Sequence, residues 1–254
     1  MNTILEAKKI NKVYEIKKGN TQQVLQDVDI SIGEGEFVSV MGPSGSGKST
    51  LLYNISGMDK AASGNIQFCG KELTTMKEEA LSALRLQKMG FIFQQSNLLK
   101  NLNILDNIIL SAFMSKGENR QVIVERAKKL MKQTGISELA DNDITQASGG
   151  QLQRVAICRA LINNPDIVFG DEPTGALNSK ATDEVLDILA EINRAGTTIM
   201  LVTHDARVAA KSERVLFMSD GVISGEKRLG KYQKDSDIKA RESQLSTWLT
   251  QMGF

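Results

Sequence analysis

Residues 36–56 read EFVSVMGPSGSGKSTLLYNIS, and this segment carries the strongest indication of the fold. It begins with a near-continuous apolar run that ends in glycine, which is typical of a buried strand. Residues 42–49 match the phosphate-loop pattern G-x-x-x-x-G-K-[ST], and the sequence becomes helical from Lys48 to Ser56. This order of strand, loop and helix predicts a phosphate-binding loop, because a plain glycine turn would leave the Lys-Ser pair unexplained.

The loop contains the groups that binding a nucleotide phosphate requires. Its glycines let successive N–H groups point at phosphate oxygens, and the following helix adds the positive end of its dipole. Lys48 is expected to reach the β- and γ-phosphates, and Ser49 is expected to ligate Mg²⁺. The candidate nucleotide-binding residues of the loop are Gly42, Pro43, Ser44, Gly45, Ser46, Gly47, Lys48, Ser49 and Thr50.

The composition limits the class of protein. The 254 residues suffice for one large α/β domain or for one domain with an inserted subdomain. Lys and Arg total 31 against 30 Asp and Glu, so the net charge of +1 gives no reason to expect a nucleic-acid surface. Cys69 and Cys158 lie far apart without metal-ligand spacing, which predicts reduced thiols in a cytosolic protein. No window approaches the ~20 apolar residues of a membrane-spanning helix, so the chain is expected to be soluble by itself.

Apolar periodicity predicts an α/β fold: a phosphate-loop core with a largely parallel sheet, an antiparallel β subdomain and a helical insertion. The core is expected over residues 3–227, with helices at three- and four-residue apolar spacing over about 97–160. Asp220-Gly221 predicts a tight hairpin turn. The predicted strands are residues 4–14, 24–32, 36–42, 63–73, 90–94, 166–172 and 197–205.

Residues 228–254 are expected to form a polar extension that ends in a short amphipathic helix. An apolar stripe at i, i+3, i+4 and i+7 marks this helix. The stripe either packs on its own domain or offers a docking face to a partner. It consists of Leu245, Trp248, Leu249 and Met252.

Two strands are expected to end in groups suited to phosphoryl transfer. The apolar strand in IVFGDEP, residues 167–173, is expected to end in two carboxylates. Asp171 can hold the metal, and Glu172 can polarise the attacking water. His204 is the chain's one histidine and is expected to end the strand TIMLVTH, where it can donate a hydrogen bond to the γ-phosphate. The candidate catalytic residues are Glu172, His204, Lys48 and Gln94.

Gln94 and Tyr14 are each expected to end a strand. Gln94 follows GFIF and can ligate Mg²⁺ or the attacking water through its side-chain carbonyl. The candidate metal ligands are therefore Ser49, Gln94 and Asp171. Tyr14 can stack on adenine, although a tyrosine at a strand end is commonly a packing residue.

A second glycine-rich loop, TQASGGQLQR at residues 145–154, precedes another helical pattern. Ser148 and the N–H groups of Gly149 and Gly150 stand at the start of this helix, where the dipole favours an anion. The chain therefore carries two candidate phosphate sites.

The order of these motifs resembles that of ATP-binding cassette ATPases. Phosphate loop, Gln94, ASGGQ at 147–151, FGDEP at 169–173 and His204 follow one another as in that family, and the match covers roughly residues 3–225. In the family, the ASGGQ-type signature closes over the γ-phosphate bound to the phosphate loop of a second cassette. The resemblance thus implies that Ser148, Gly149, Gly150 and Gln151 bind the nucleotide of a second copy of the chain.

The resemblance also implies the partners and the cofactors. Two Mg·ATP would join two cassettes, and hydrolysis would let the dimer open. The groove around Gln94 and the helix at 97–108 would grip an integral-membrane permease, so the chain would work at the cytoplasmic face of the cell membrane. The permease would contact the transported substrate, and no direct nucleic-acid contact is expected.

Two segments narrow the choice among subfamilies of these ATPases. NLLKNLNILDNI (97–108) and EPTGALNSK (172–180) resemble cassettes of macrolide-efflux, lipoprotein-release and bacitracin-type antimicrobial-peptide resistance permeases. Lys100, where many relatives carry proline, and the polar extension favour the bacitracin-type group. The departures from the family pattern, none of which removes a catalytic group, are Ala147, Asn178 and Ile144.

Two other function classes are compatible with a cassette. One is a non-transport ATPase that remodels nucleic acid or protein assemblies; a single cassette, no long insertion and the small net charge disfavour it. The other is a regulatory nucleotide-binding module without turnover, which Glu172 and His204 disfavour.

Overall fold

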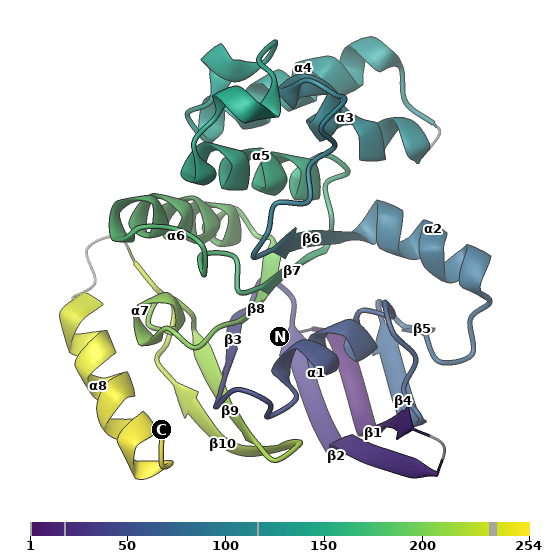
Figure 1. Cartoon of the computed structure of the whole chain (residues 1–254), viewed down its shortest axis with the longest axis vertical. Helices are drawn as coiled ribbons and strands as arrows, with labels where there is room; N and C mark the ends of the chain where they lie inside the picture. Colours follow the sequence, from purple (N-terminus) through teal and green to yellow (C-terminus); the bar gives the residue numbers. More distant parts are fainter. Residues whose placement is uncertain (1, 18, 116, 234–237) are drawn as a thin grey trace. The chain divides into compact units, whose positions relative to one another are not determined.

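Figure 1 shows the computed structural model, which describes residues 2–17, 19–115, 117–233 and 238–254. Its contacts define two compact units. The first unit comprises Met1–Leu81 and Thr198–Phe254, and the second comprises Ser82–Thr197. The chain passes from the first unit to the second within helix α2 (Glu78–Lys88). The division into a core, a helical subdomain and an extension was drawn from sequence patterns and stays a prediction.

The first unit contains a four-stranded antiparallel sheet in the order β2-β1-β4-β5 (Figure 1). Its long strands β1 (Thr3–Lys17) and β2 (Asn20–Gly33) confirm the antiparallel pair expected from the sequence. Residues 63–73 are two strands, β4 (Ser63–Phe68) and β5 (Lys71–Glu72), rather than one. The single-strand prediction was wrong because Cys69 and Gly70 both take left-handed backbone angles, φ 49° and 73°, and turn the chain into a hairpin.

A second set of strands in the first unit follows the order β10-β9-β3-β8. Strand β3 (Phe37–Met41) is buried at every residue and pairs in parallel with β8 (Thr198–Val202) and β9 (Arg214–Ser219). The predicted turn at Asp220 and Gly221, with φ of 48° and 79°, reverses the chain into β10 (Val222–Arg228). Because β3 has a parallel neighbour on each side, the loop that follows it leaves from the middle of these strands.

The C-terminal helix α8 (Ile238–Gln251) packs on its own unit. Leu245 and Leu249 are 0% and 3% exposed and join a core cluster with Met41, Phe217 and other residues of the first unit. Trp248 meets the Phe217 ring edge-on at 6.2 Å between centroids. Of the two roles left open for the apolar stripe, the structure favours packing within the chain.

The second unit holds the helices expected between residues 97 and 160. Strands β6 (Met89–Phe93) and β7 (Ile167–Asp171) pair in parallel. Helices α3 (Ile104–Met114), α4 (Arg120–Gln133) and α5 (Gly149–Leu161) share one apolar cluster, which includes Ile108, Met131 and Val155. Short 3-10 turns occupy Ser137–Leu139 and Ile144–Gln146, and α6 (Ser179–Arg194) follows β7. Across the described residues, no helix combines the length and apolarity that a bilayer crossing needs.

Candidate functional site

The phosphate loop has the backbone that an anion cradle requires. It leaves β3 at Met41 and enters helix α1 (Lys48–Ile55), whose first turn has no side-chain cap. Gly42 has φ 147°, and a Cβ there would stand 1.9 Å from the carbonyl oxygen of Met218. Gly45, at the exposed turn with φ 81°, has open space where a Cβ would be, and the described residues offer its N–H no partner. The N–H of Gly45 is therefore available to an anion.

Lys48 lies over this loop. Its residue is 8% exposed, and Nζ donates hydrogen bonds to the carbonyl oxygens of Gly42 at 2.9 Å and Pro43 at 2.8 Å. The hydroxyl of Ser46 is buried without a hydrogen-bond partner among the described residues. A buried ammonium group and an unpaired buried hydroxyl beside a glycine turn fit a phosphate ligand, whose oxygens accept from both.

His204 lies at the same strand edge as the start of the phosphate loop. Val40 and Val202 are register partners, and the N–H of Thr203 continues the pairing by donating to the Val40 carbonyl at 3.1 Å. The expectation that His204 ends the strand was wrong by two residues, because β8 ends at Val202. The exposed imidazole instead stands in the turn before helix α7 (Ala206–Ala209).

Asp205 holds this turn. Its carboxylate caps α7 by accepting from the N–H of Arg207 at 2.8 Å, and its own N–H donates to the Thr203 hydroxyl at 3.0 Å. Burial opposes the charge, but the hydrogen bonds from Arg207 and the proximity of His204 hold the pKa of Asp205 below its usual value. Residues on both sides of His204 are thus tied down, whereas the imidazole is exposed.

Tyr14 does not end its strand, because β1 continues to Lys17. Its hydroxyl donates to Asp59 Oδ2 at 2.7 Å, and Lys12 Nζ lies 4.7 Å from the ring centroid. Burial and the hydrogen bond to Asp59 raise the pKa of the Tyr14 hydroxyl. Lys12 also pairs with Asp59 at 2.7 Å. The ring is 39% exposed, so these partners orient it without enclosing it.

The second unit brings Gln94, Asp171 and Glu172 to one strand edge. Phe93 and Asp171 are register partners at the ends of β6 and β7, and Gln94 and Glu172 are the next residues. Gln94 therefore follows its strand rather than ending it. A Cβ on Gly175 would stand 2.8 Å from Gln94 Nε2, so the amide lies against the loop after Glu172.

Glu172 has a left-handed backbone, with φ 48°. A residue with a side chain takes this conformation at a cost of about 1–2 kcal/mol, so the surrounding loop must hold it there. The Glu172 carbonyl accepts from the N–H of Gly175 at 3.0 Å, and the loop ends where Asn178 caps α6 by accepting from the N–H of Ala181 at 2.9 Å. Asn178, one of the departures from the family pattern, therefore keeps the capping role that an aspartate would have.

The second glycine-rich loop is the start of α5. Ser148 and Gln151 form a capping box: the Ser148 hydroxyl accepts from the Gln151 N–H, and the Ser148 N–H donates to Gln151 Oε1 at 2.8 Å. Gly149 and Gly150 provide the first two N–H groups of the helix, for which the described part of the chain holds no acceptor. A Cβ on Gly150 would stand 2.9 Å from Ala181 Cβ, so this glycine also has a packing role.

The candidate residues thus form three groups, one in the first unit and two in the second. Tyr14, the loop residues 42–50 and His204 belong to the first unit. Gln94, Asp171, Glu172 and the loop at 148–151 belong to the second. Sequence reasoning missed the residues that support these groups, such as Asp59 and Thr203, because nothing in a single sequence pairs them with residues far away along the chain.

The proposed metal ligands have suitable chemistry. A hydroxyl of Ser49, an amide oxygen of Gln94 and a carboxylate of Asp171 are all oxygen donors, which Mg²⁺ prefers. The donor set therefore fits a hard divalent cation that accompanies a nucleotide.

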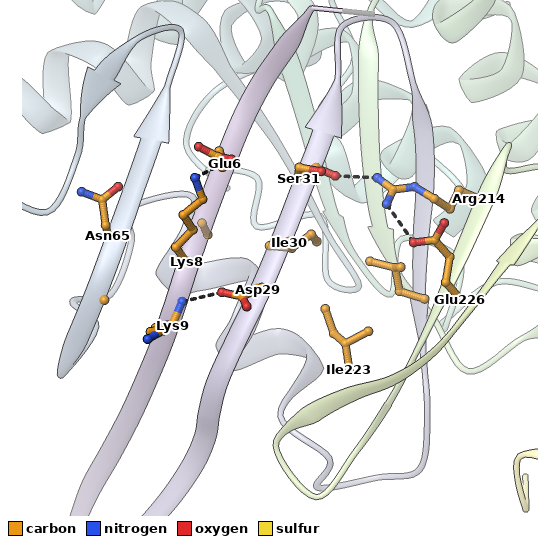
Figure 2. Close-up of a pocket in the computed structure, with 13 residues that line it drawn as sticks. Glu6, Lys8, Lys9, Asp29, Ile30, Ser31, Asn65, Arg214, Ile223 and Glu226 are labelled. Carbon is orange, nitrogen blue, oxygen red and sulfur yellow. Dashed lines mark hydrogen bonds and ion pairs between the residues drawn. The ribbon is translucent and has the colours of Figure 1, made fainter.

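A cavity in the first unit lies elsewhere (Figure 2). It has a volume of about 690 Å³ and is lined by residues of β1, β2, β4, β9 and β10, none of them a candidate site residue. Two ion pairs line it: Glu6 with Lys8 at 2.9 Å, and Arg214 with Glu226 at 3.2 Å.

The strand–loop–helix with its buried lysine, together with the carboxylates at a parallel strand end, defines a phosphate-loop ATPase of the cassette type. The family model described as ABC transporter matches residues 25–175, and the chain belongs to this family. This confirms the resemblance and the α/β fold class expected from the sequence, and membership implies ATP binding and hydrolysis.

Three comparisons place the chain within the family. The bacitracin export ATP-binding protein BceA of Halalkalibacterium halodurans is 44% identical over 221 residues, which cover 87% of each chain. The macrolide export ATP-binding/permease protein MacB of Rhodopseudomonas palustris is 45% identical over 203 residues, 80% of this chain but 31% of MacB. The chain therefore spans about a third of that relative.

Among solved structures, the dimeric ATP-binding cassette MJ0796, in a post-hydrolysis state bound to ADP and Pi, is similar with a TM-score of 0.83 and 37% identity. The match covers 90% of this chain and all of that one.

Proposed function

We propose that this chain is the Mg²⁺-dependent ATP-hydrolysing subunit of an ABC transporter that drives a partner membrane permease. Lys48 and the N–H groups of the phosphate loop bind the β- and γ-phosphates, and Tyr14 stacks on adenine. Ser49, Gln94 and Asp171 would hold Mg²⁺, which would supply positive charge to the phosphate oxygens.

Glu172 orients and polarises the attacking water, since its carboxylate follows the strand end at which Asp171 stands. His204 donates a hydrogen bond to the γ-phosphate, where negative charge develops during transfer. The tight turn around His204 and the strained backbone of Glu172 support these roles, because groups that must act in one geometry are commonly held by their surroundings. Both groups are assigned to the nucleotide held by the phosphate loop of the same chain.

We assign the start of α5 to the nucleotide of a second copy. Ser148, Gly149, Gly150 and Gln151 present a helix N-terminus whose first two N–H groups have no acceptor in the described part of the chain. Such an end attracts an anion. This glycine-rich helix start is the observation that carries the proposal, and the dimeric structure of a cassette 37% identical to this chain supports it. ATP then joins two half-sites, and the charges of ADP and phosphate release them.

The partner permease places the chain at the cytoplasmic face of the cell membrane. We infer antimicrobial-peptide export or resistance of the bacitracin type as the transport process, because BceA matches the chain over 87% of both lengths. The permease contacts the cargo, and the chain contacts ATP, the permease and a second copy of itself.

Replacing Glu172 with glutamine tests the ATPase and the dimer together. The variant keeps the fold and the nucleotide but lacks the carboxylate that polarises water, so an ATP-bound dimer should accumulate. Light scattering with and without Mg·ATP measures the mass. Glu138→Gln, at an exposed residue of the same unit, is the matched control and should behave as wild type. A Glu172→Gln protein that stays monomeric with saturating ATP would contradict the proposal.

A macrolide-efflux or lipoprotein-release complex is the second candidate, favoured by 45% identity to MacB. Co-expression of the chain with a permease of each type, followed by affinity capture of the chain, distinguishes the two. Recovery of an ATPase-stimulating complex with a MacB-type permease and with no BceA-type permease would favour the second candidate.

A further inference from the structure

Arg241 of helix α8 has a set of contacts that the proposed function does not use. Its guanidinium donates four hydrogen bonds, each to a backbone carbonyl. The acceptors are Ala210 at 2.7 Å, Ser212 and Leu229 at 2.8 Å, and Gly230 at 2.9 Å. A guanidinium has five N–H donors, so nearly all of them are committed to holding two backbone segments, residues 210–212 and 229–230.

Two of the acceptors belong to the segment that carries His204. Helix α7 (Ala206–Ala209) begins one residue after Asp205, and Ala210 is its C-terminal cap. The last carbonyls of a helix have no partner within it and carry partial negative charge. Arg241 therefore caps this end of α7, as Asp205 caps the other end. The turn with His204 is joined directly to a helix held at both ends.

The apolar face of α8 reinforces the same contact. Leu245 and Leu249 pack with Ala209 and Ala210 of the α7 segment and with Met41, the residue before the phosphate loop. In Figure 1, α8 lies beside α7, with which it makes contact. The ring of Tyr232 lies below Arg241, 5.7 Å from the guanidinium carbon to the ring centroid. Helix α8 thus supports the backbone on which His204 stands.

We propose that Arg241 is a positioning residue for ATP hydrolysis. By capping α7, it holds His204 in the position from which the imidazole donates a hydrogen bond to the γ-phosphate. The proposal rests on the role assigned to His204 under the proposed function. It gives the C-terminal extension a part in turnover rather than in recognition of a partner. Removal of the guanidinium releases the carbonyls of Ala210 and Ser212 and lets the α7 segment shift.

The expected effect separates turnover from binding. A displacement of about 1 Å at a catalytic group can lower the rate up to about a hundredfold, so Arg241→Ala should reduce kcat by about ten- to a hundredfold. The phosphate loop binds most of the nucleotide and is not held by Arg241, so KM for ATP should change by no more than about twofold. Arg241→Lys keeps the charge and some of the donors and should restore part of kcat.

A double-mutant cycle with His204→Ala tests the mechanism. If Arg241 acts through His204, Arg241→Ala should lower kcat in the wild type but have little further effect when His204 is already alanine. Lys239→Ala, an exposed cation on the same helix, is the matched control and should leave kcat unchanged in both backgrounds. Hydrogen exchange should speed up at residues 203–212 of Arg241→Ala and stay unchanged at residues 42–50.

The outcomes distinguish the positioning role of Arg241 from the role of His204 in hydrolysis. Equal losses of kcat from Arg241→Ala in both backgrounds would overturn the positioning role and leave the role of His204 intact. Wild-type kcat in His204→Ala would overturn both. Should Arg241→Ala fail to fold, Arg241→Lys in the two backgrounds gives the same comparison, and a loss of kcat that persists without His204 overturns the proposal.

Discussion

A comparison of glycine with alanine at position 172 tests whether the backbone at the proposed water-positioning residue is strained. Glu172 has φ 48°, a region in which a residue with a Cβ is about 1–2 kcal/mol less stable. Glu172→Gly and Glu172→Ala lose the same carboxylate and all its contacts, so their difference isolates the backbone. Glycine relieves the strain but adds about 0.5–1 kcal/mol of unfolded-chain entropy. The glycine variant should therefore be more stable by roughly 1 kcal/mol.

Urea denaturation followed by far-UV circular dichroism measures the two free energies of unfolding. Thermal denaturation should show the same order, at about 2–4 °C per kcal/mol for a chain of this size. Glu138 supplies the matched pair, because its backbone lies in the ordinary helical region of a 3-10 turn in the same unit. There the alanine variant should be the more stable by about 0.5–1 kcal/mol. The reasoning is refuted if the Glu172 pair shows the same order as the Glu138 pair.

The remaining predictions concern the buried groups. Glu36→Gln should lower the free energy of unfolding by about 3 kcal/mol, because it weakens the pairing of the buried Arg214 at 2.6 Å; a loss below about 1 kcal/mol in a denaturation experiment would contradict this. Gly42→Ala should abolish binding of a fluorescent ATP analogue, since the new Cβ would lie 1.9 Å from a carbonyl oxygen of β9, and a wild-type Kd would refute it. Burial raises the pKa of Cys158 to about 12, so a thiol reagent at mildly alkaline pH should label Cys69 alone in the folded protein. Stability should fall as pH rises above the ordinary Cys pKa of 9.0, because the unfolded chain then ionises Cys158 and the folded chain does not; a flat profile would exclude this linkage.

The phosphate-loop core was predictable from the sequence because its signals are local. The apolar run of β3, the spacing from Gly42 to Ser49 and the helix from Lys48 all lie within about twenty residues. The same holds for the turn at Asp220 and Gly221. Element ends were harder to predict: β1 continues past Tyr14 because residues 15–17 pair with residues 20–21 of β2, and such pairing depends on the partner strand.

Other features needed coordinates because they depend on residues far apart in the chain. An amphipathic stripe such as that of α8 predicts that a face is buried but does not name what covers it. The contacts of Tyr14 with Asp59 and of Arg241 with Ala210 join residues about thirty or more positions apart. The backbone angle of Glu172 has no signal in the sequence, since glutamate rarely adopts it.

Mixing two inactive variants measures most directly whether each ATP site is shared by two chains. Lys48→Ala damages the phosphate loop, and Ser148→Arg places a bulky cation at the start of α5. In a mixed dimer of these chains, one site receives both lesions and the other receives none. The account predicts that ATPase activity reappears when the two variants are mixed. The control mixes wild type with a chain that carries both substitutions. In that mixed dimer every site carries a lesion. Activity that stays absent when Lys48→Ala and Ser148→Arg proteins are mixed, although both fold and dimerise, would contradict the shared site.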